Sequence, residues 1–371
     1  MTHKSAGRML ARRRFLSAAG ASVAAAPLAA PAIATAQGQT TTWRVQSSWG
    51  GGPGLEAFYE WSNSIVEVSG GELAFDARKD GELVKRFDIY DGVRAGQLEA
   101  AHNFTIDAGR FDPAGVFLSS YPLAMRTTSE WDVFYYGLGG LELAREIYAK
   151  QNLFFVGPIH HGPNIIHSKK PIRYLDDFRG LKMRTPGGMV EQLFQQLGAE
   201  TITLPGAEIM PAFQSGRIDA ADFVGPSINY AYGFAEETKF ISMGPAGYMS
   251  IYQPVDLMDL TVNQAAWDAL SPEMKLLVER EVQNFSDIHH AKIQKADQDS
   301  WAQYAAEGVE VSRITPEDVR LLTKVAASIW FDWASRSPDA ARVFKVQLDY
   351  MASGSLGYVE QEIADLFNDT L

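Results

Sequence analysis

Residues 180–226 read GLKMRTPGGMVEQLFQQLGAETITLPGAEIMPAFQSGRIDAADFVGP, and this stretch decides the fold class. Leu181–Arg184 is predicted as a short strand, because Pro186 and two glycines end it and a helical run follows at once from Met189. A second helix, which ends near Gly216, leads into another short strand that a Gly-Pro pair closes. This alternation is typical of α/β sheets, in which ligands bind beyond the carboxyl ends of the strands.

Arg184 ends the first of these strands and is the strongest candidate for a ligand-binding residue. It is expected to face a helix N-terminus, where backbone N–H groups and the helix dipole favour an anion. A guanidinium binds a carboxylate through two parallel, charge-assisted hydrogen bonds. The alternative is that Arg184 is an exposed arginine at a strand end or forms an ion pair between strands. Asp222 and Phe223 stand at the second strand end, and nothing in this stretch looks like a nucleophile.

The alternation of strands and helices extends from the start of the chain to about Gln264, after which the chain becomes almost purely helical. Strands are predicted over residues 43–46, 73–76, 98–101, 153–156 and 164–167, and helices over 55–68, near 89 and over 129–149. A long helix is predicted to start at Pro272 and to continue to about Ala306, since Ser271 suits the N-cap and proline suits the first turn. Another starts at Pro316. Such helices pack across the back of two lobes, or alternatively on a second copy of the chain.

The first 36 residues have the features of a secretory targeting segment. Arg12–Leu16 reads RRRFL, which is a twin-arginine signature, and an apolar, alanine-rich stretch follows over 18–33. Ala34-Thr35-Ala36 is a suitable cleavage site. A transmembrane anchor is the alternative, but the stretch is rich in alanine and holds two prolines, so it is weakly apolar for that role. We therefore expect a twin-arginine signal peptide and export to the periplasm.

Composition excludes several classes of function. The chain has a net charge of −12, and the targeting segment holds basic residues but no acidic one, so the remainder is still more acidic. Such acidity argues against nucleic acid or an anionic membrane as a partner, and it means that an anionic ligand needs a local positive group. The absence of cysteine excludes thiol catalysis and zinc–thiolate or iron–sulfur sites. The length favours two lobes.

Several short motifs occur in a characteristic order and together suggest a family. They are Trp43-Arg44-Val45 with Ser47-Ser48, Gly81–Val84, Gly96–Glu99, Phe111-Asp112-Pro113, Gly180–Arg184 and the segment GRIDAADFVGP over 216–226. In these motifs the chain resembles the periplasmic substrate-binding subunits of tripartite ATP-independent periplasmic (TRAP) transporters of the DctP type. It is similar to the branch of that family that binds 2-oxo and 2-hydroxy acids.

The resemblance implies an α/β fold of the two-lobed periplasmic binding protein type, with crossing strands between the lobes and long C-terminal helices. Lobe I is expected to comprise residues 37–160 and about 251–292. Lobe II is expected to comprise residues 161–250 and, with the C-terminal helices, about 293–371. The crossing strands are expected near 159–163 and 253–260.

The resemblance also assigns roles to residues of the cleft. Arg184 holds the ligand carboxylate. Asp222 stands where the branch has a metal-binding glutamate, and Phe223 stands where it has a tryptophan. Gln253 matches the second metal carboxylate of the branch, so one negative charge is lost. The ion would be calcium or sodium bound with the ligand.

Three further residues are predicted to line the cleft. The pocket glutamine of the branch corresponds to Pro163, and Asn164 beside it is a possible substitute. Asp107 lies where the branch has tyrosines, and it either caps a turn or adds a carboxylate to the cleft. Trp49 follows the first strand and is expected to form part of the wall.

The histidines do not predict a metal site. The spacing of His160 and His161, of His167, and of His289 and His290 matches no helical zinc motif. The last pair is predicted to lie on a solvated helix face.

The leading hypothesis is a periplasmic binding protein, not an enzyme, that captures a small 2-oxo or 2-hydroxy monocarboxylate between two lobes. It would deliver this acid to the integral-membrane subunits of a TRAP permease, and it could form a homodimer. The alternative ligand is zwitterionic or sulfonated, such as an amino acid or a taurine-like compound. More distant alternatives are a sensor, or a periplasmic hydrolase or lyase that uses Asp107, Asp222 and His161.

Overall fold

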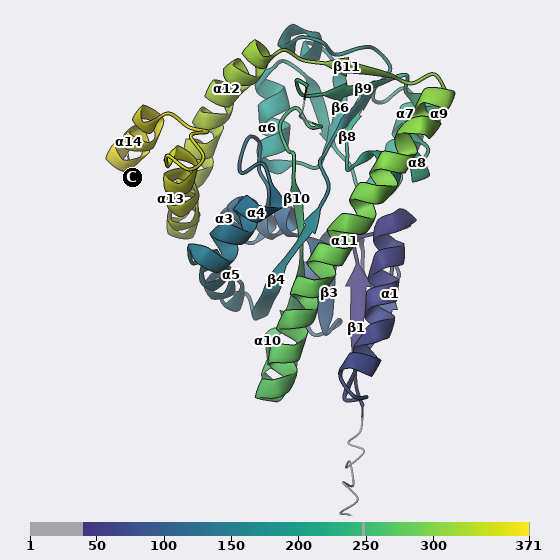
Figure 1. Ribbon diagram of the computed structural model, residues 1–371, viewed down its shortest axis with the longest axis vertical. Coiled ribbons are helices and arrows are strands. Elements are labelled where there is room, and N and C mark those ends of the chain that lie inside the picture. The colour runs from purple at the N-terminus through teal and green to yellow at the C-terminus, as the bar shows by residue number, and fades with distance from the viewer. Residues whose placement is uncertain (1–39, 247–248, 371) are drawn as a thin grey trace, which may run out of the picture. The chain divides into compact units, whose positions relative to one another are not determined.

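The computed structural model describes residues 40–246 and 249–370, so the predicted signal peptide, residues 1–36, lies outside the described residues. Two sheets organise the described part (Figure 1). The first has the order β2-β1-β3-β10-β4 and the second has the order β11-β9-β5-β8-β6-β7. No helix in the described ranges has the length and apolar character needed to cross a membrane.

The strands of the first sheet are β1 (Thr41–Ser47), β2 (Leu73–Arg78), β3 (Ala100–Phe104), β4 (Leu153–His161) and β10 (Asp256–Asn263). Those of the second sheet are β5 (Ile166–Ser168), β6 (Lys182–Thr185), β7 (Glu200–Thr203), β8 (Ala220–Asp222), β9 (Phe240–Met243) and β11 (Glu310–Arg313). Each predicted strand overlaps one of these.

The helices that precede the long C-terminal ones are α1 (Gly52–Val68), α2 (Ile89–Arg94), α3 (Ala114–Leu118), α4 (Thr128–Asp132), α5 (Gly140–Ala149), α6 (Gly188–Gln196), α7 (Ile209–Gln214), α8 (Pro226–Ala231), α9 (Phe234–Glu237) and α10 (Gln264–Asp268). The C-terminal ones are α11 (Pro272–Ala306), α12 (Pro316–Ala334), α13 (Pro338–Ala352) and α14 (Gln361–Thr370).

Each sheet is parallel apart from one reversed strand. β10 pairs antiparallel with β3 and β4, and β5 pairs antiparallel with β8 and β9. Each reversed strand follows a crossing of the chain from one sheet to the other, β5 after β4 and β10 after β9, and α11 makes a third connection. The crossing segments lie side by side, because the amide of Asn164 donates to the carbonyl of Gln253 at 3.0 Å and that of Asp256 donates to Gly162 at 3.1 Å. The predicted α/β fold with crossing strands is therefore confirmed.

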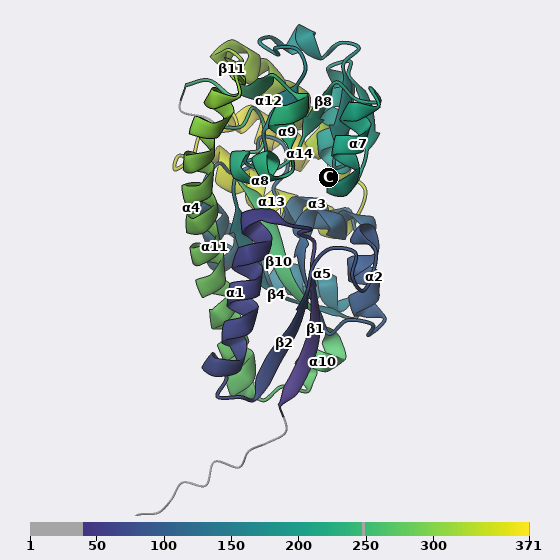
Figure 2. The same cartoon turned by 90° about the vertical axis from the view of Figure 1, so that its right-hand side faces the viewer.

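Helix α11 links the two sheets along one side. It packs on β4 and α1 beside the first sheet and on α8 beside the second, and both views show it running past these elements (Figures 1 and 2). Its start has the predicted chemistry, since Ser271 accepts a hydrogen bond from the amide of Met274 and Pro272 follows it. The predicted end at Ala306 is also confirmed.

The single helix predicted over residues 129–149 is wrong. The chain instead forms α4, a π-helical turn over Val133–Gly137, and α5. Gly139 takes a left-handed conformation with φ of 86°, which a helix interior does not allow. A side chain at Gly140 would also lie 2.7 Å from the ring of Phe134. The glycines therefore break the helix so that this aromatic ring can pack closely.

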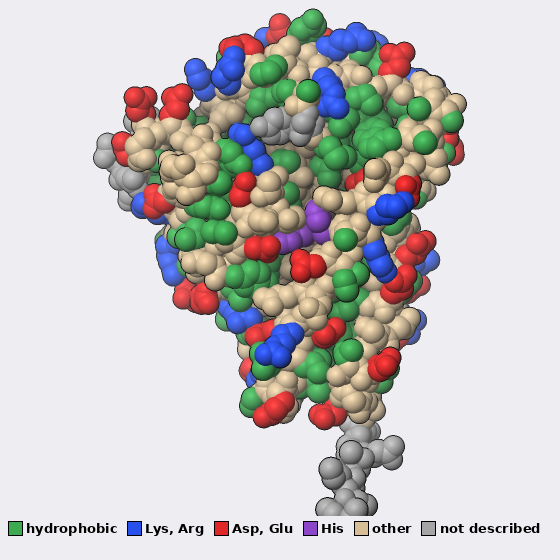
Figure 3. Space-filling view, in the orientation of Figure 1, with side chains coloured by type: hydrophobic (Ala, Val, Ile, Leu, Met, Phe, Trp, Pro, Cys, Tyr) green, Lys and Arg blue, Asp and Glu red, His purple; other side chains and the backbone are tan. Residues whose placement is uncertain are grey.

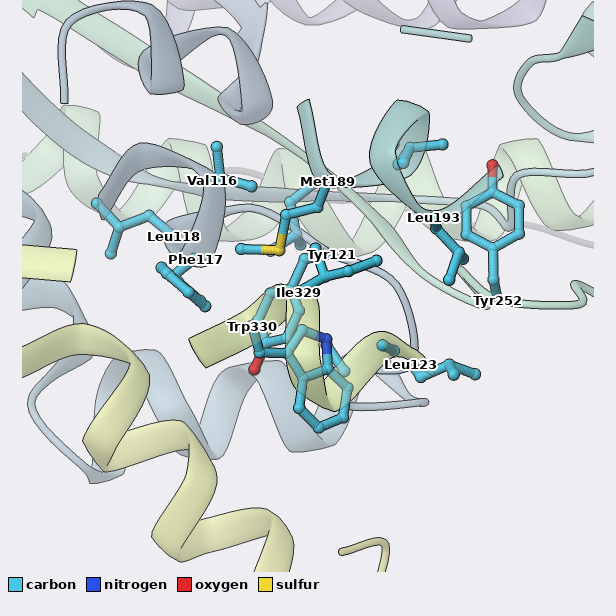
Figure 4. Close-up of a cluster of buried hydrophobic side chains, with 14 of the residues drawn as sticks. Val116, Phe117, Leu118, Tyr121, Leu123, Met189, Leu193, Tyr252, Ile329 and Trp330 are labelled. Atoms are coloured by element: carbon cyan, nitrogen blue, oxygen red, sulfur yellow. The ribbon is translucent and has the colours of Figure 1, made fainter. Parts of the chain in front are cut away.

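A large apolar cluster connects α12 and α13 to α6 and to Tyr252 (Figure 4). Trp330 of α12 packs against Tyr121, and its ring nitrogen donates to the carbonyl of Pro122 at 2.9 Å. Tyr252 stands beside Leu193 at one side of this cluster (Figure 4). The ring of Tyr252 is buried here, and its hydroxyl serves the site described next.

Candidate solute-binding site

A cavity that is partly open to solvent is lined by residues that follow strands of both sheets. All seven residues predicted to face the cleft line it: Trp49, Asp107, Asn164, Arg184, Asp222, Phe223 and Gln253. The lining also includes Ser48, Asp80, Arg86, Phe104, Tyr232 and Asp256, to which the sequence analysis gave no role. The predicted site residues are thus brought together in one place, and their roles stay proposals.

Arg184 lies at the end of β6 and is 5 % exposed. Its Nε donates to the carbonyl of Leu204 at 2.9 Å, and its Nη1 donates to the carbonyl of Asp222 at 2.6 Å. The guanidinium carbon lies 5.2 Å from the centre of the Phe223 ring. Burial lowers the pKa of Arg184 to about 10, so the group stays charged at neutral pH. Two of its donors are thus fixed by backbone carbonyls, and a guanidinium held in this way has further N–H groups of the kind that bind carboxylates.

Asp222 ends β8 and is fully buried. The Tyr252 hydroxyl donates to its Oδ1, whereas its Oδ2 has no hydrogen-bond partner. Burial raises the pKa of Asp222 to about 7, and the nearby Arg184 and the Tyr252 hydroxyl oppose that rise. A buried carboxylate oxygen without a partner, at the wall of a cavity, fits a cation or an ammonium group that arrives with the ligand.

The crossing segments add a polar group beside Asp222. The side-chain nitrogen of Asn164 donates to Oε1 of Gln253 at 3.2 Å in one orientation of its amide, and to Oδ2 of Asp256 at 3.3 Å in the reversed orientation. The side-chain nitrogen of Gln253, Nε2, donates to the carbonyl of Ser120 at 2.8 Å and to Oδ1 of Asp256 at 3.2 Å. Burial raises the pKa of Asp256 to about 7, although the Leu257 amide, which donates to it, acts in the opposite direction.

Asp107 lies in the turn Thr105–Arg110 that follows β3. It forms an ion pair with Arg86, whose Nη1 also donates to Oδ1 of Asn103 at 3.1 Å. Asp107 therefore adds a carboxylate to the cavity, but Arg86 neutralises it. Nearby, Oδ1 of Asp80 is buried without a partner, and burial raises the pKa of this carboxyl group.

Aromatic rings form the apolar part of the wall. Trp49 is 1 % exposed and packs edge-on against Phe104, with ring centres 4.9 Å apart. Phe223 packs against Tyr232 at 5.4 Å on the side of the second sheet. The lining has one serine, Ser48, and its hydroxyl has no hydrogen-bond partner. The site thus has the means to hold a small charged molecule.

The prediction that His289 and His290 lie on a solvated face is wrong for His289, which is fully buried. Its ring lies 5.5 Å from that of His161 and 6.0 Å from that of His102. Burial holds the pKa of each of these three histidines well below its ordinary value. The pattern missed this because α11 is covered here by β3 and β4, which are distant in sequence.

Other histidine atoms reach the surface near acidic side chains (Figure 3). His160 lies 3.2 Å from the carboxylate of Asp132. Across the described residues, no three or more histidine, aspartate or glutamate side chains gather in an arrangement that could hold a metal ion. A cation in the cavity would therefore need neutral protein oxygens and ligand oxygens as well as carboxylates.

The fold and the site define a class of protein. Two mixed sheets joined by crossing strands, with a polar cavity lined from both, are the architecture of a solute-binding receptor. The chain belongs to the family of bacterial extracellular solute-binding proteins, family 7 (DctP), whose model matches residues 51–336.

Similar proteins agree with this family. The monocarboxylate 2-oxoacid-binding periplasmic protein of Nostoc sp. (strain PCC 7120) is 31% identical over 233 residues, which is 62% of this chain and 62% of that protein. Its match therefore spans less than two thirds of either chain.

Solved structures share the fold. A TRAP periplasmic solute-binding protein from Colwellia psychrerythraea with bound calcium and pyruvate has 21% identity and a TM-score of 0.76, covering 90% of this chain and 98% of that one. One from Pseudoalteromonas atlantica T6c with bound sodium and pyruvate has 21% identity and a TM-score of 0.74, covering 90% and 100%.

Proposed function

We propose that this protein captures a small 2-oxo or 2-hydroxy monocarboxylate in the cavity and presents it to the membrane subunits of a TRAP permease for uptake driven by an ion gradient. The observation that carries the proposal is Arg184, a buried guanidinium with two donors fixed by backbone carbonyls and one side toward the cavity. The family membership and the relative that binds 2-oxoacids support the same function.

A cation bound with the acid is part of the proposal. The unpartnered Oδ2 of Asp222 and the side-chain oxygen of Gln253 are suited to hold calcium or sodium, ions that accept oxygen ligands in an irregular shell. The ion would supply positive charge to the oxygens of the acid. Asn164, Phe223, Trp49 and Asp107 would shape and orient the rest of the ligand.

The place and assembly of the protein are also proposals. We propose that it acts in the periplasm after export by the twin-arginine pathway, that it is a receptor without enzymatic activity, and that it can form a homodimer. The division into lobe I (37–160 and about 251–292) and lobe II (161–250 and about 293–371) is proposed in the same way. Support comes from the family of extracellular receptors and from the two sheets.

A second candidate ligand is a zwitterion such as an amino acid or aminosulfonate. Asp222 and Asp256 are both buried at the cavity wall, and an ammonium group could take the place of the metal ion. Its anionic end would still bind Arg184.

A thermal-shift screen tests the proposal. The exported form of the protein is mixed with small carboxylates, sulfonates and amino acids, each with calcium and each with a chelator. We expect pyruvate or a related acid to raise the melting temperature with calcium but not with chelator. Stabilisation by a zwitterion in chelator, with none by simple acids, would instead establish the second candidate. No shift with any of these compounds would contradict both.

A further inference from the structure

The carboxylates of the cavity are arranged differently from what the resemblance implies. The sequence places neutral Gln253 where a second metal carboxylate is expected, and Asp107 is paired with Arg86. Neither can add a free negative charge beside Asp222. Asp256, three residues after Gln253, also lines the cavity and is 4 % exposed.

Backbone pairing brings Asp256 and Asp222 to the same part of the wall. The residue after Asp222, Phe223, donates its amide to the carbonyl of Ile165 at 3.2 Å. The preceding residue, Asn164, donates its amide to Gln253, whose side chain in turn donates to Asp256. The two carboxylates are thus separated by one crossing segment.

The carboxylate oxygens of Asp256 and Asp222 differ in the hydrogen bonds that they accept from the protein. Oδ1 of Asp256 accepts hydrogen bonds from the amide of Leu257 at 2.8 Å and from Gln253, and these bonds orient the carboxylate. Its Oδ2 accepts a hydrogen bond from the side chain of Asn164 at 3.3 Å when that amide is turned toward it. Oδ2 of Asp222 has no hydrogen-bond partner. Asp222 therefore keeps one oxygen that the protein does not use, and Asp256 keeps one oxygen that is bonded to a neutral side chain.

We infer that Asp256, together with Asp222, supplies the negative charge that binds the cation, and that this cation is calcium rather than sodium. The inference rests on the proposed function, because it assumes a monocarboxylate bound at Arg184. It makes Gln253 a residue that positions Asp256 and at most a neutral oxygen ligand.

The balance of charge favours a divalent ion. The ion pair of Arg86 and Asp107 compensates itself, and Arg86 also lies near the buried carboxyl group of Asp80, whose pKa is raised by burial. Arg184 compensates the ligand carboxylate, and the charges of Asp222 and Asp256 remain. Calcium neutralises both, whereas sodium leaves one buried charge uncompensated, which is costly away from water. Calcium also tolerates an irregular shell of carboxylate and amide oxygens, whereas magnesium requires a small and nearly regular octahedron.

The experiment measures calcium directly on protein that has been stripped with chelator. Calcium is titrated by calorimetry in the presence of saturating pyruvate and a large excess of sodium. We expect one calcium to bind each wild-type chain, and Asp256→Asn to weaken calcium binding by about tenfold or more. The double variant Gln253→Glu with Asp256→Asn should recover most of that loss, because it returns the charge to the neighbouring side chain.

Glu208→Gln is the matched control, since Glu208 is an exposed acid next to a lining residue but does not line the cavity. It should bind calcium as the wild type does. Melting temperatures establish that each variant is folded, and recovery by the double variant shows that the loss is one of charge.

Unchanged calcium binding by Asp256→Asn would overturn the inference and leave the proposed function in place. Wild-type binding of pyruvate that is as tight in sodium with chelator as it is in calcium would also overturn the inference and leave the proposed function in place. Failure of the wild type to bind pyruvate or any related acid, with or without calcium, would overturn both.

Discussion

Arg184 shows how a single residue can serve the fold and the ligand together. Its Nε and Nη1 donate to the carbonyls of Leu204 and Asp222. Leu204 follows β7 and Asp222 ends β8, the two strands that flank β6. The remaining edge is therefore aimed before any ligand arrives. Pre-orientation of this kind reduces the entropy that is lost on binding.

At the same scale, the buried histidines predict a dependence of stability on pH. Neither ring nitrogen of His161 has a hydrogen-bond partner. Burial, with added repulsion from His289, His290 and His102, holds its pKa well below the ordinary value of 6.5. Above pH 6.5 the unfolded and folded states both carry a neutral ring. As the pH falls below 6.5, the unfolded state gains a proton that the folded state does not accept, so the folded state loses stability.

His161→Leu should remove this loss. Relative to the wild type, the free energy of unfolding of the variant should rise by about 2 kcal/mol between pH 7.5 and pH 5. Urea denaturation at both values measures it, and each protein serves as its own reference at pH 7.5. A difference between the two proteins that does not change with pH would show that His161 takes up a proton as readily in the folded state as in the unfolded state.

Sequence reasoning found some site residues and missed others for a physical reason. Arg184 and Asp222 end strands inside recognisable motifs, so their positions could be predicted from local pattern. Asp256 and Arg86 contact residues that are distant in sequence. Asp256 contacts Asn164, and Arg86 contacts Asp107. A linear pattern carries no signal for such contacts.

At the scale of elements, the start of α8 is fixed against the long helix α11. Oδ1 of Asp297 accepts hydrogen bonds from the amide of Ser227 at 2.8 Å and from its hydroxyl at 2.5 Å. Gly225 stands just before α8, and a Cβ atom there would lie 2.7 Å from Oδ2 of Asp297. Its φ of −71° suits any residue, so only the closeness of the two elements requires glycine.

Gly225→Ala should therefore destabilise the protein by about 1–3 kcal/mol, because the added methyl group overpacks the contact between α8 and α11. Gly354→Ala is the matched control, since no atom lies within 4 Å of the position that its Cβ would take. The control should change stability by less than about 0.5 kcal/mol. Equal midpoints of urea denaturation for the two variants would refute the tight packing of α8 on α11.

The elements also show where prediction of the fold succeeds and fails. The start of α11 at Pro272 is encoded locally by a serine cap and a proline, so its position was predictable. The break between α4 and α5 depends on how Phe134 packs over Gly140, which is a tertiary contact. The sequence pattern alone therefore predicted one helix where the chain forms α4 and α5.

At the scale of the whole molecule, the cavity draws its walls from both sheets, and the crossing segments are the connections between them. A ligand that contacts Arg184 on one wall and Trp49 on the other should favour a closed arrangement, as in hinge-bending proteins. We expect small-angle scattering to show a smaller radius of gyration when pyruvate and calcium saturate the protein.

Arg184→Ala under the same conditions should show no contraction, which separates ligand binding from an effect of calcium on the whole chain. An unchanged radius of the wild type, with binding established independently, would mean that the cavity is preformed and that no hinge motion accompanies binding.

The most direct test of the account is a calorimetric titration of pyruvate, in calcium, into the wild type, Arg184→Ala and Arg184→Lys. We expect saturable binding of one pyruvate to each wild-type chain. Arg184→Ala should lose about 2–5 kcal/mol of binding free energy, since the carboxylate would lie buried without its partner. Arg184→Lys should recover only part of this loss, because an ammonium group cannot make the two-pronged contact. An alanine variant that binds pyruvate as tightly as the wild type would contradict the central claim that this buried guanidinium holds the ligand.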